Sequence, residues 1–315
     1  MSEKLLEIKN LKVYYPVKLK NTINKKGFVK AVNDISFDIY KGETFGLVGE
    51  SGCGKSTTGK TIVKLNKPTE GEILFEGNDI FKNKDISKDI QIIFQDPYSS
   101  LDPRFTVERI IEEPLVVAGV KKEERKARVK KLMSEVGLRE DQASKFPHEF
   151  SGGQRQRIGI ARALACDPKL IVCDEPVSAL DVSIQAQVLN MMHDLQKNHS
   201  LTYLFISHNL SVIRHVCDRI GVMYLGEIVE MADKKELFDN SLHPYTKALM
   251  RAIPIPDPEY VNQDEVLSGE VPSPLNPPVG CCFCTRCPLA SEECRNKKPV
   301  AREIKPGHMV CCHKV

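Results

Sequence analysis

The alternation of apolar and polar residues predicts that the chain opens with β-strands. Residues 6–15 alternate over their whole length, as in a strand with one buried and one solvated face. A loop rich in lysine and asparagine follows over residues 18–30, and then a pair of short strands at 29–32 and 35–40. We therefore expect an antiparallel piece before any parallel sheet begins.

Beyond residue 40, short apolar runs alternate with stretches of helical periodicity. The apolar runs predict buried strands at 43–48, 71–77, 90–95, 170–176 and 202–206. The helical periodicity predicts helices at 55–65, 107–117, 123–136, 154–166 and 182–197. This order is typical of an α/β fold. The helices between residues 104 and 165 form an insertion that we expect to be a helical subdomain.

Length and charge set further bounds. At 315 residues the chain is long enough for one large α/β domain and an appendage. Its net charge of +3 gives no reason to propose nucleic acid as a main partner. The start, Met1-Ser2-Glu3-Lys4, is polar, and no stretch reaches the roughly 18 to 20 apolar residues that span a bilayer. We therefore expect no signal peptide and a soluble or peripheral protein.

Residues 49–57, Gly-Glu-Ser-Gly-Cys-Gly-Lys-Ser-Thr, match the phosphate-loop pattern G-x-x-x-x-G-K-[ST] with no mismatch. The loop lies between a predicted strand and a predicted helix, so backbone N–H groups and the positive end of the helix dipole converge on one anion. Glycines within the loop let the main chain curl around phosphates. Lys55 would contact the β- and γ-phosphates, and the Ser56 hydroxyl would ligate Mg²⁺.

Polar residues also end or follow three of the predicted strands. Gln95 ends the first, Asp174 and Glu175 end the second, and His208 follows the third. The carboxyl ends of strands form the ligand crevice of an open α/β sheet. We expect Asp174 to hold the Mg²⁺ shell, and Glu175 to orient or deprotonate an attacking water. Gln95 could coordinate Mg²⁺ or a metal-bound water, although a lone glutamine at a strand end is more often only hydrated. His208 could contact the γ-phosphate, although a lone histidine is usually structural.

A second helix start of the anion-binding type begins at Ser151. Ser151 is a good N-cap, and Gly152 and Gly153 leave backbone N–H groups open to an anion. Because Lys55 already serves one nucleotide, the simple geometric interpretation is that this site serves a nucleotide held by another copy. Further on, a turn over residues 178–181 ends at Asp181, which would cap the helix at 182–197.

The eleven cysteines are unevenly spread. We expect Cys53, Cys166, Cys173 and Cys217 to be small, reduced, buried residues. The other seven lie between Cys281 and Cys312, beyond a proline-rich stretch at 253–278 that is typical of an extended linker. Thiolates gathered this densely repel one another unless a metal neutralises them, so this pattern favours a metal site.

These motifs together resemble the ATP-binding subunit of an ABC transporter over about residues 5–255. The resemblance implies an ABC-type P-loop ATPase domain with a mixed sheet, an antiparallel N-terminal β piece and a helical subdomain. It implies Glu175 and His208 as catalytic residues and Asp181 as the D-loop residue. The implied ATP-binding residues are Tyr15 (with Tyr14 as an alternative), Gly49, Ser51, Gly52, Cys53, Gly54, Lys55, Ser56, Thr57 and Gln95. The implied signature is Ser151, Gly152, Gly153 and Gln154, and the implied Mg²⁺ ligands are Ser56, Gln95 and Asp174.

The resemblance extends to the oligopeptide and dipeptide importer branch. Residues 95–104, 243–249 and 269–274 look like stretches of that branch. It implies that two ATPase subunits close head to tail on two ATP molecules, each signature completing its partner's site. It further implies two membrane permease subunits, an extracytoplasmic peptide-binding protein that acts indirectly, and a peripheral position on the cytoplasmic face of the cell membrane.

Related importers also carry a C-terminal cysteine pattern that maps to Cys281, Cys287, Cys294 and Cys312, and some hold a [4Fe–4S] cluster with it. A zinc site with four cysteines, or with three cysteines and a histidine, is the rival interpretation, and unmetallated thiols are the third. Cys282, Cys284 and Cys311 are extra. They leave open the choice between residues 281 and 282 and between 311 and 312.

The expected organisation is an ATPase domain over residues 1–253 and a linker with a small Cys-rich extension over 254–315. The main functional hypothesis is ATP-driven peptide import. Alternatives are the ATPase of a related nickel importer, and a soluble ABC protein acting on ribosomes or nucleic acid. Proteins of the last class commonly carry two cassettes, whereas this chain has a single phosphate loop. A third interpretation makes the cysteine tail a redox or iron sensor that controls the ATPase.

Overall fold

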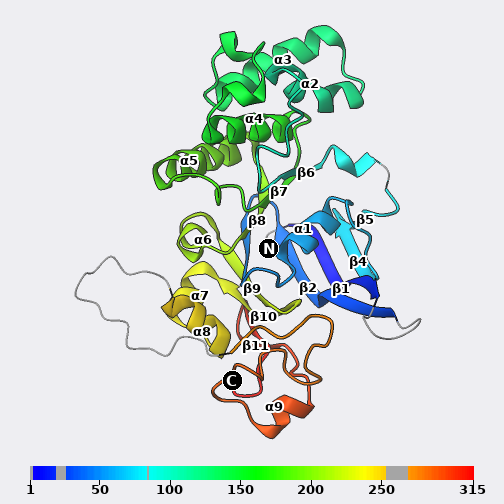
Figure 1. Cartoon of the computed structure of the whole chain (residues 1–315), viewed down its shortest axis with the longest axis vertical. Coiled ribbons are helices and arrows are strands. Elements are labelled where there is room, and N and C mark those ends of the chain that lie inside the picture. Colours follow the sequence, from blue (N-terminus) through cyan, green and yellow to red (C-terminus); the bar gives the residue numbers. More distant parts are fainter. Residues whose placement is uncertain (1–2, 19–25, 84, 253–268) are drawn as a thin grey trace, which may run out of the picture. The chain divides into compact units, whose positions relative to one another are not determined.

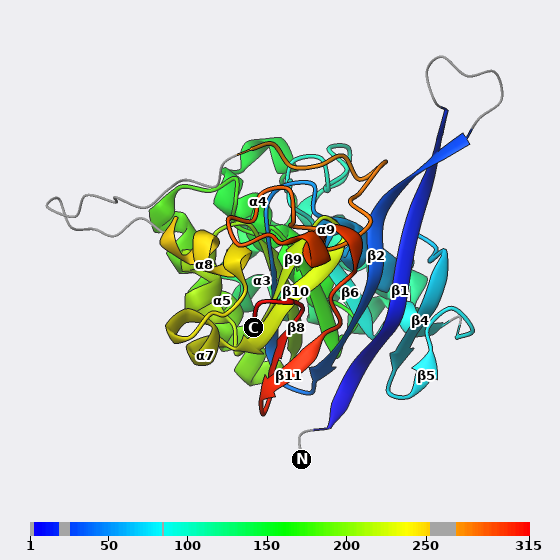
Figure 2. The ribbon, with the colours of Figure 1, turned by 90° about the horizontal axis from the view of Figure 1, so that it is seen from below.

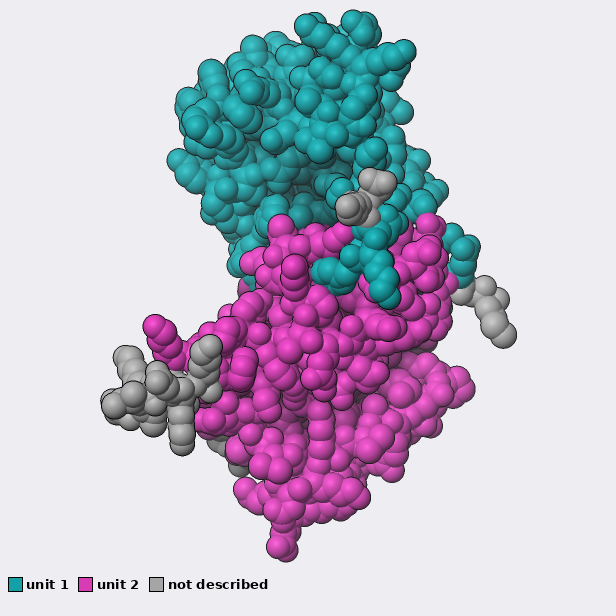
Figure 3. All heavy atoms as spheres, turned by 90° about the vertical axis from the view of Figure 1, so that its right-hand side faces the viewer, with its two compact units in different colours: residues 1–3, 40–44, 80–206 teal, residues 4–39, 45–79, 207–315 magenta. Residues whose placement is uncertain are grey.

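The structure is a computed structural model that describes residues 3–18, 26–83, 85–252 and 269–315. The chain, drawn as a ribbon in Figure 1, divides into two compact units, which Figure 3 shows in different colours. Unit 1 comprises residues 1–3, 40–44 and 80–206, and unit 2 comprises residues 4–39, 45–79 and 207–315.

The core of unit 1 is a set of parallel strands. β6 (Ile90–Ile93) pairs with β7 (Leu170–Asp174), and β7 pairs with β8 (Thr202–Ser207). Every residue of β7 and β8 is buried, which explains why both read as continuous apolar runs. β6 ends two residues earlier than the sequence predicts, so Gln95 follows the strand rather than ending it.

Helices make up most of the rest of unit 1. They are α2 (Val107–Val117), α3 (Lys122–Glu135), α4 (Gly152–Leu164) and α5 (Val182–His199), with short 3₁₀ helices η1 (Asp85–Ser87), η2 (Glu140–Gln142) and η3 (Pro147–Glu149). The predicted helical insertion is confirmed, and the bounds predicted for these four helices hold to within two residues, whereas the helix predicted at 55–65 ends at Ile62. α2 begins where the Thr106 hydroxyl accepts a hydrogen bond from the Arg109 N–H, and it buries Ile110, Ile111 and Leu115.

Unit 2 contains the expected antiparallel piece, with one correction. Its four strands lie in the order β2-β1-β4-β5, with bounds β1 (Lys4–Lys18), β2 (Lys26–Tyr40), β4 (Glu70–Phe75) and β5 (Asn78–Asp79). The predicted pair of strands at 29–32 and 35–40 is wrong, because β2 runs through both. Asp34 takes a left-handed conformation (φ 69°) within the strand, so the expected turn is only a local irregularity. Of the predicted loop at 18–30, residues 19–25 lie outside the described residues and residues 26–30 belong to β2.

A second group of strands in unit 2 carries the phosphate-loop segment. In the order β11-β12-β10-β9-β3, these strands are β11 (Arg302–Lys305), β12 (His308–Val310), β10 (Glu227–Asp233), β9 (Arg219–Tyr224) and β3 (Thr44–Val48) (Figures 1 and 2). β3 and β9 are parallel, and the other neighbours are antiparallel. The end of the Cys-rich segment therefore extends a sheet of unit 2.

The helices of unit 2 are shorter. They are α1 (Lys55–Ile62), α6 (Leu210–Val216), α7 (Lys234–Asp239), α8 (Pro244–Arg251) and α9 (Glu292–Asn296). Within the described ranges, no helix combines the length and the apolar character that crossing a membrane requires. The predicted linker at 253–278 lies outside the described residues as far as residue 268, and the predicted division at residue 253 stays a prediction.

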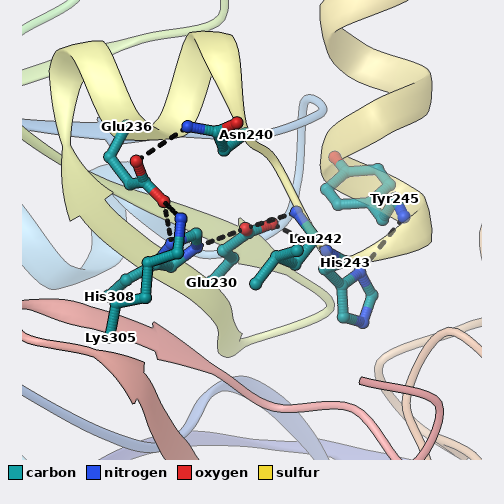
Figure 4. A network of polar contacts seen from close by, with 8 residues as sticks. All are labelled: Glu230, Glu236, Asn240, Leu242, His243, Tyr245, Lys305 and His308. Carbon is teal, nitrogen blue, oxygen red and sulfur yellow. Dashed lines mark hydrogen bonds and ion pairs between the residues drawn. The ribbon is translucent and has the colours of Figure 1, made fainter.

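Buried polar contacts hold the C-terminal strands of unit 2 in place (Figure 4). Glu230 of β10 accepts hydrogen bonds from the N–H groups of Leu242 and His243, and one of its oxygens lies 2.8 Å from Nε2 of His308. Nδ1 of His308 lies 3.2 Å from Glu236 of α7. Because Glu230 and His308 are each only 1% exposed, these contacts are shielded from water, and β12 is fixed to both β10 and α7.

Candidate functional site

The Gly-rich loop of unit 2 is built where only glycine fits. A Cβ on Gly49 would lie 2.0 Å from the Met223 carbonyl oxygen, and one on Gly54 would lie 2.2 Å from the Ala31 carbonyl oxygen. These distances are shorter than any non-bonded contact, so the backbone path requires glycine at both positions. The backbone of the loop therefore packs directly against the backbone of β9 and β2, with no room for a side chain at these two positions.

Lys55 lies inside this loop. Its side chain is 4% exposed, and Nζ donates to the carbonyl oxygens of Gly49 at 2.8 Å and Glu50 at 2.9 Å. α1 begins at Lys55, and its N-cap Gly54 has no side chain to cap the first N–H groups. The loop therefore brings an ammonium group and a helix N-terminus together, which is the arrangement that binds phosphates. Ser56 and Thr57 lie half-buried in the first turn.

The remaining residues of the predicted loop differ in their exposure to solvent. Ser51 and Gly52 are exposed at the tip of the loop, whereas Cys53 is buried. Burial raises the pKa of the Cys53 thiol, so it is a protonated packing residue.

The two tyrosines at the end of β1 differ in environment. The Tyr14 hydroxyl donates to Oδ1 of Asn33 at 2.6 Å, whereas Tyr15 is 39% exposed. An exposed ring is the one that can stack on a base, so the environments favour Tyr15 over Tyr14.

In unit 1, Gln95 and Glu175 lie together at the ends of neighbouring strands. Nε2 of Gln95 donates to Oε2 of Glu175 at 2.9 Å. Asp174, the last residue of β7, is 3% exposed. Glu175 has a left-handed backbone conformation (φ 48°), which is uncommon for a residue with a side chain and is found at functional sites. The Glu175 N–H donates to the Ile206 carbonyl oxygen, which fixes this conformation.

His208 belongs to unit 2. It is exposed and directly follows β8, before Asn209 caps α6 by accepting from the N–H groups of Ser211 and Val212. The cap therefore fixes the backbone between β8 and α6, and His208 lies exposed on this segment of unit 2.

The predicted signature begins α4 as expected. The Ser151 hydroxyl accepts from the Gln154 N–H, and the Gln154 side chain accepts from the Ser151 N–H. A Cβ on Gly153 would lie 2.5 Å from Cγ2 of Ile184, so this glycine permits close contact between α4 and α5. Gly152 and Ser151 are exposed. Asp181 is at the N-cap position of α5, but its side chain makes no capping hydrogen bond.

Hydrogen bonds reach the sulfurs of several of the seven C-terminal cysteines. Backbone N–H groups donate to the sulfurs of Cys281, Cys287 and Cys312, and the Ser291 hydroxyl lies 3.4 Å from the Cys294 sulfur. Cys311 instead donates to the Pro299 carbonyl oxygen. N–H donors stabilise a thiolate. At Cys281 the hydrogen bonds outweigh burial and lower the pKa, whereas at Cys287 and Cys312 burial outweighs them and raises it.

The pKa values differ among these cysteines. Hydrogen bonds from Cys282 and His243 lower the pKa of Cys281 to about 4, against the effect of burial. Burial raises the pKa of Cys311 to about 12 and that of Cys282 well above its ordinary value. Within the described ranges, no three histidine, cysteine or acidic side chains come close enough to bind a single metal ion. Of the four scattered cysteines, Cys53, Cys173 and Cys217 are buried as expected, but Cys166 is only half-buried.

Two residues far along the chain, with no role predicted from the sequence, contact the phosphate loop. The Tyr245 hydroxyl accepts from the Glu50 N–H at 2.9 Å, and Arg286 pairs with the Glu50 carboxylate. Tyr245 lies in the stretch at 243–249 that the resemblance had singled out, and Arg286 directly precedes Cys287 of the predicted cysteine pattern. Only the fold brings them to the loop.

Two family models match the chain. The ABC transporter model matches residues 32–178, and the model of the oligopeptide/dipeptide transporter C-terminal region matches residues 229–294. The first match spans the phosphate loop, Gln95, the signature and Glu175, and the second spans Tyr245 and Arg286.

Full-length relatives match over nearly the whole chain. The chain is 53% identical to the oligopeptide transport ATP-binding protein AppF of Bacillus subtilis, over 99% of this chain and 97% of that protein. It is 50% identical to the oligopeptide transport ATP-binding protein OppF of Salmonella typhimurium, over 99% of this chain and 96% of that protein.

Solved structures with a similar fold are ABC cassettes. One is cbiO1 from Clostridium perfringens, part of the ABC transporter complex cbiONQ, with a TM-score of 0.65 and 26% identity over 76% of this chain and 92% of that one. Another is an ATP-binding cassette solved as a dimer in a post-hydrolysis state with ADP and Pi. Its TM-score is 0.64, with 30% identity over 73% of this chain and 99% of that one.

Proposed function

The chain belongs to the oligopeptide transport ATP-binding proteins of the ABC transporter family, and from this premise we propose that it hydrolyses ATP to power import of oligopeptides or dipeptides through a membrane permease. The observation that carries the proposal is the loop at 49–56 with buried Lys55, in a chain that aligns over its full length with oligopeptide transport ATPases. These relatives favour a peptide cargo over a nickel chelate.

The loop of unit 2 supplies the phosphate-binding groups. Lys55 already donates to two backbone oxygens of the loop, and on binding ATP it would exchange these for oxygens of the β- and γ-phosphates. The N–H groups at the start of α1 would donate to the same phosphates. Tyr15 would stack on the adenine ring.

Unit 1 supplies the groups that act on water. The Gln95 amide donates to one oxygen of Glu175 and so holds the carboxylate as an acceptor. Glu175 would accept the proton of the attacking water, and His208 of unit 2 would donate to the γ-phosphate. Mg²⁺, bound by Ser56, Gln95 and Asp174, would neutralise charge on the phosphate oxygens. Hydroxyl, amide and carboxylate oxygens are the ligands that Mg²⁺ prefers, so these residue types fit the ion.

The signature would act on the nucleotide of a second ABC ATPase subunit. Ser151 and the N–H groups of Gly152 and Gly153 lie at an exposed helix start, as a site for a phosphate from outside the chain requires. The dimeric cassette of similar fold supports this pairing. Asp181, exposed at the start of α5, would lie at the same interface between subunits.

A groove on unit 1, lined mostly by charged residues with three apolar ones among them, is the surface we assign to a permease subunit. Phe105, Arg109, Val116, Val117 and Lys122 line a groove of 580 Å³ formed by α2 and α3. Val117 is 85% exposed and Val116 is 51% exposed, although both are apolar. Exposed apolar residues rimmed by charges mark a protein contact. The subunit would then lie peripherally on the cytoplasmic face of the membrane, with the extracytoplasmic peptide-binding protein acting only through the permease.

We also propose that Cys281, Cys287, Cys294 and Cys312 hold a [4Fe–4S] cluster. Hydrogen bonds that lower the pKa of Cys281 support a thiolate there, and backbone N–H groups also donate to the sulfurs of Cys287 and Cys312. A cluster binds each cysteine at a separate iron, so its sulfurs need not converge as closely as those of a zinc site. Such a cluster supplies a one-electron couple and cross-links its four cysteines.

The cluster proposal is tested by anaerobic reconstitution with iron and sulfide. The wild-type chain and C282S should develop the broad visible absorption of iron–sulfur charge transfer, and C294S should not. Equal absorption in C294S and C282S, or none in the wild type, would contradict this ligand set.

The transport proposal is tested in vesicles that contain the chain with its co-purified membrane subunits and the peptide-binding protein. Labelled oligopeptide should accumulate only when ATP is present on the side of this chain, and unlabelled peptide should compete with it. Accumulation of a nickel chelate in place of peptide would contradict the proposal that the cargo is a peptide. Association with ribosomes and no membrane subunits would point to the soluble class.

A further inference from the structure

Glu50, the second residue of the phosphate loop, is paired with an arginine from the Cys-rich extension. Nη1 of Arg286 lies 2.7 Å from Oε2 of Glu50, and Nη2 lies 3.1 Å from Oε1. This is a bidentate arrangement, which fixes the carboxylate in direction as well as in distance. The Arg286 side chain is 6% exposed and that of Glu50 is 28% exposed, so water screens the pair only in part.

Aromatic side chains hold the arginine in this position. The Arg286 guanidinium lies 5.8 Å from the ring centroid of Tyr224, and Nη1 is 3.5 Å from the Tyr224 hydroxyl. Tyr224 in turn packs against Tyr245 and Phe283, with ring centroids 4.7 Å and 5.2 Å away. Rigid, buried rings leave the guanidinium little freedom, so it is organised before any nucleotide binds.

The same cluster also holds the backbone of Glu50. The Tyr245 hydroxyl accepts a hydrogen bond from the Glu50 N–H, while the Glu50 carbonyl oxygen accepts one from Lys55. Glu50 is thus held at its N–H by α8, at its side chain by the extension and at its carbonyl by the loop lysine. Its conformation sets where Lys55 and the next N–H groups of the loop lie.

The pairing also has an electrostatic consequence. A carboxylate in a loop that binds a triphosphate repels the ligand, because like charges repel strongly where water screens them only in part. An arginine paired with that carboxylate opposes this repulsion. Because Arg286 comes from a stretch 236 residues away, the extension itself supplies this compensation.

We propose that Arg286 is a positioning residue of the nucleotide site: by holding and neutralising Glu50, it gives the phosphate loop its affinity for ATP. The Cys-rich extension is then part of the nucleotide site, because Arg286 lies between Cys284 and Cys287. Any change that shifts the backbone around Cys287 would act on ATP binding through Arg286. This inference rests on the proposed function only in that the loop binds ATP.

The test is a titration of the purified full-length chain with a fluorescent ATP analogue. R286Q should weaken binding at least about tenfold, because removing one partner leaves a carboxylate beside the phosphates. R286K keeps the charge but not the bidentate geometry, and its affinity should be intermediate. The double variant E50Q/R286Q should bind more tightly than R286Q, since the repulsive charge is gone. R295Q, which removes an exposed arginine of the same extension, is the matched control and should bind like the wild type.

Two measurements distinguish a positioning role of Arg286 from a general loss of folded protein. Thermal unfolding of each variant gives the folded fraction, and affinity is compared per folded molecule. In the assembled transporter, R286Q should raise KM for ATP more than it lowers kcat. Should R286Q fold poorly, R286K supplies the same comparison. Equal ATP affinity of R286K, R286Q and wild type per folded molecule, or no recovery in E50Q/R286Q, would overturn the inference. No binding by the wild type would instead overturn the proposed function.

Discussion

The Gln95 amide donates to the Glu175 carboxylate at 2.9 Å, although the two residues are 80 positions apart in the chain. They come together because β6 and β7 are parallel neighbours in unit 1, so the segments that follow them begin at the same edge. The hydrogen bond orients a carboxylate whose backbone is already held in a left-handed conformation. The hydrogen bond and the backbone conformation therefore both fix the position of Glu175, and the proposed role as general base requires a fixed position.

The first prediction concerns Glu175 itself. E175Q should lower the rate of ATP hydrolysis by about 10²- to 10⁴-fold, the usual contribution of a general base, because an amide cannot accept the proton of water. ATP affinity should change little, since the phosphate-binding groups belong to the loop at 49–56. E140Q, which removes an exposed carboxylate of the same unit, is the control and should hydrolyse ATP at the wild-type rate. Steady-state phosphate release checks both, and wild-type hydrolysis by E175Q would contradict this role.

The second prediction compares two glycines of α4. G153A should destabilise the fold by about 1–3 kcal/mol, as overpacked sites do, because the new Cβ would lie 2.5 Å from Ile184. G159A, in the same helix, meets nothing within 4 Å, and should stabilise it by about 0.5–1 kcal/mol through the helix propensity of alanine. Urea unfolding of both variants measures the difference. Equal stabilities would show that the contact between α4 and α5 tolerates a side chain.

The third prediction concerns the buried contact between Glu230 and His308. H308Q should lower the free energy of unfolding by about 1–3 kcal/mol, because it removes a hydrogen-bond partner of a buried carboxylate. The exposed variant H215Q should be neutral. The double variant E230Q/H308Q should recover part of the loss. A loss no larger than that of H215Q would mean that the network in Figure 4 does not hold the C-terminal strands.

The fourth prediction is a pH dependence at Glu236. A hydrogen bond from Lys305, followed by those from Asn240 and His308, lowers the pKa of Glu236 from 4.5 to about 2. A depressed pKa means that the carboxylate stabilises the fold above pH 4.5 and that this contribution is lost as the pH falls towards 2. The stability advantage of the wild type over E236Q should therefore shrink through this window.

Unfolding curves of the wild type and E236Q at matched pH values test this, because the other acidic groups cancel in the difference. An advantage that stays constant, or grows, as the pH falls would refute the assignment of the shift to these contacts.

Local sequence pattern predicts much of the fold because it reflects local physics. The apolar runs of β7 and β8 are buried on both faces, and the α4 start at Ser151 has its capping residues in place. The pattern does not predict strands that form through pairing with segments far away in the sequence. β2 continues through Asp34 because a neighbouring strand supports it. All four residues of β11 are exposed, so no apolar alternation marks it as a strand.

The candidate site shows the same division. The glycines and Lys55 lie within one short motif, so the sequence is enough to predict a phosphate loop. The contacts of Glu50 with Tyr245 and Arg286 join residues 195 and 236 positions apart, and only the folded sheet of unit 2 brings them together. At Asp181 the position was predicted correctly, but the side chain forms no cap, because a favourable residue type does not fix a rotamer.

The most direct test of the account is peptide-stimulated ATP hydrolysis by the assembled transporter, compared between the wild type and K55A. The account predicts that peptide raises the wild-type rate, and that K55A shows neither hydrolysis nor uptake because Lys55 binds the phosphates. Wild-type hydrolysis and uptake by K55A would contradict it.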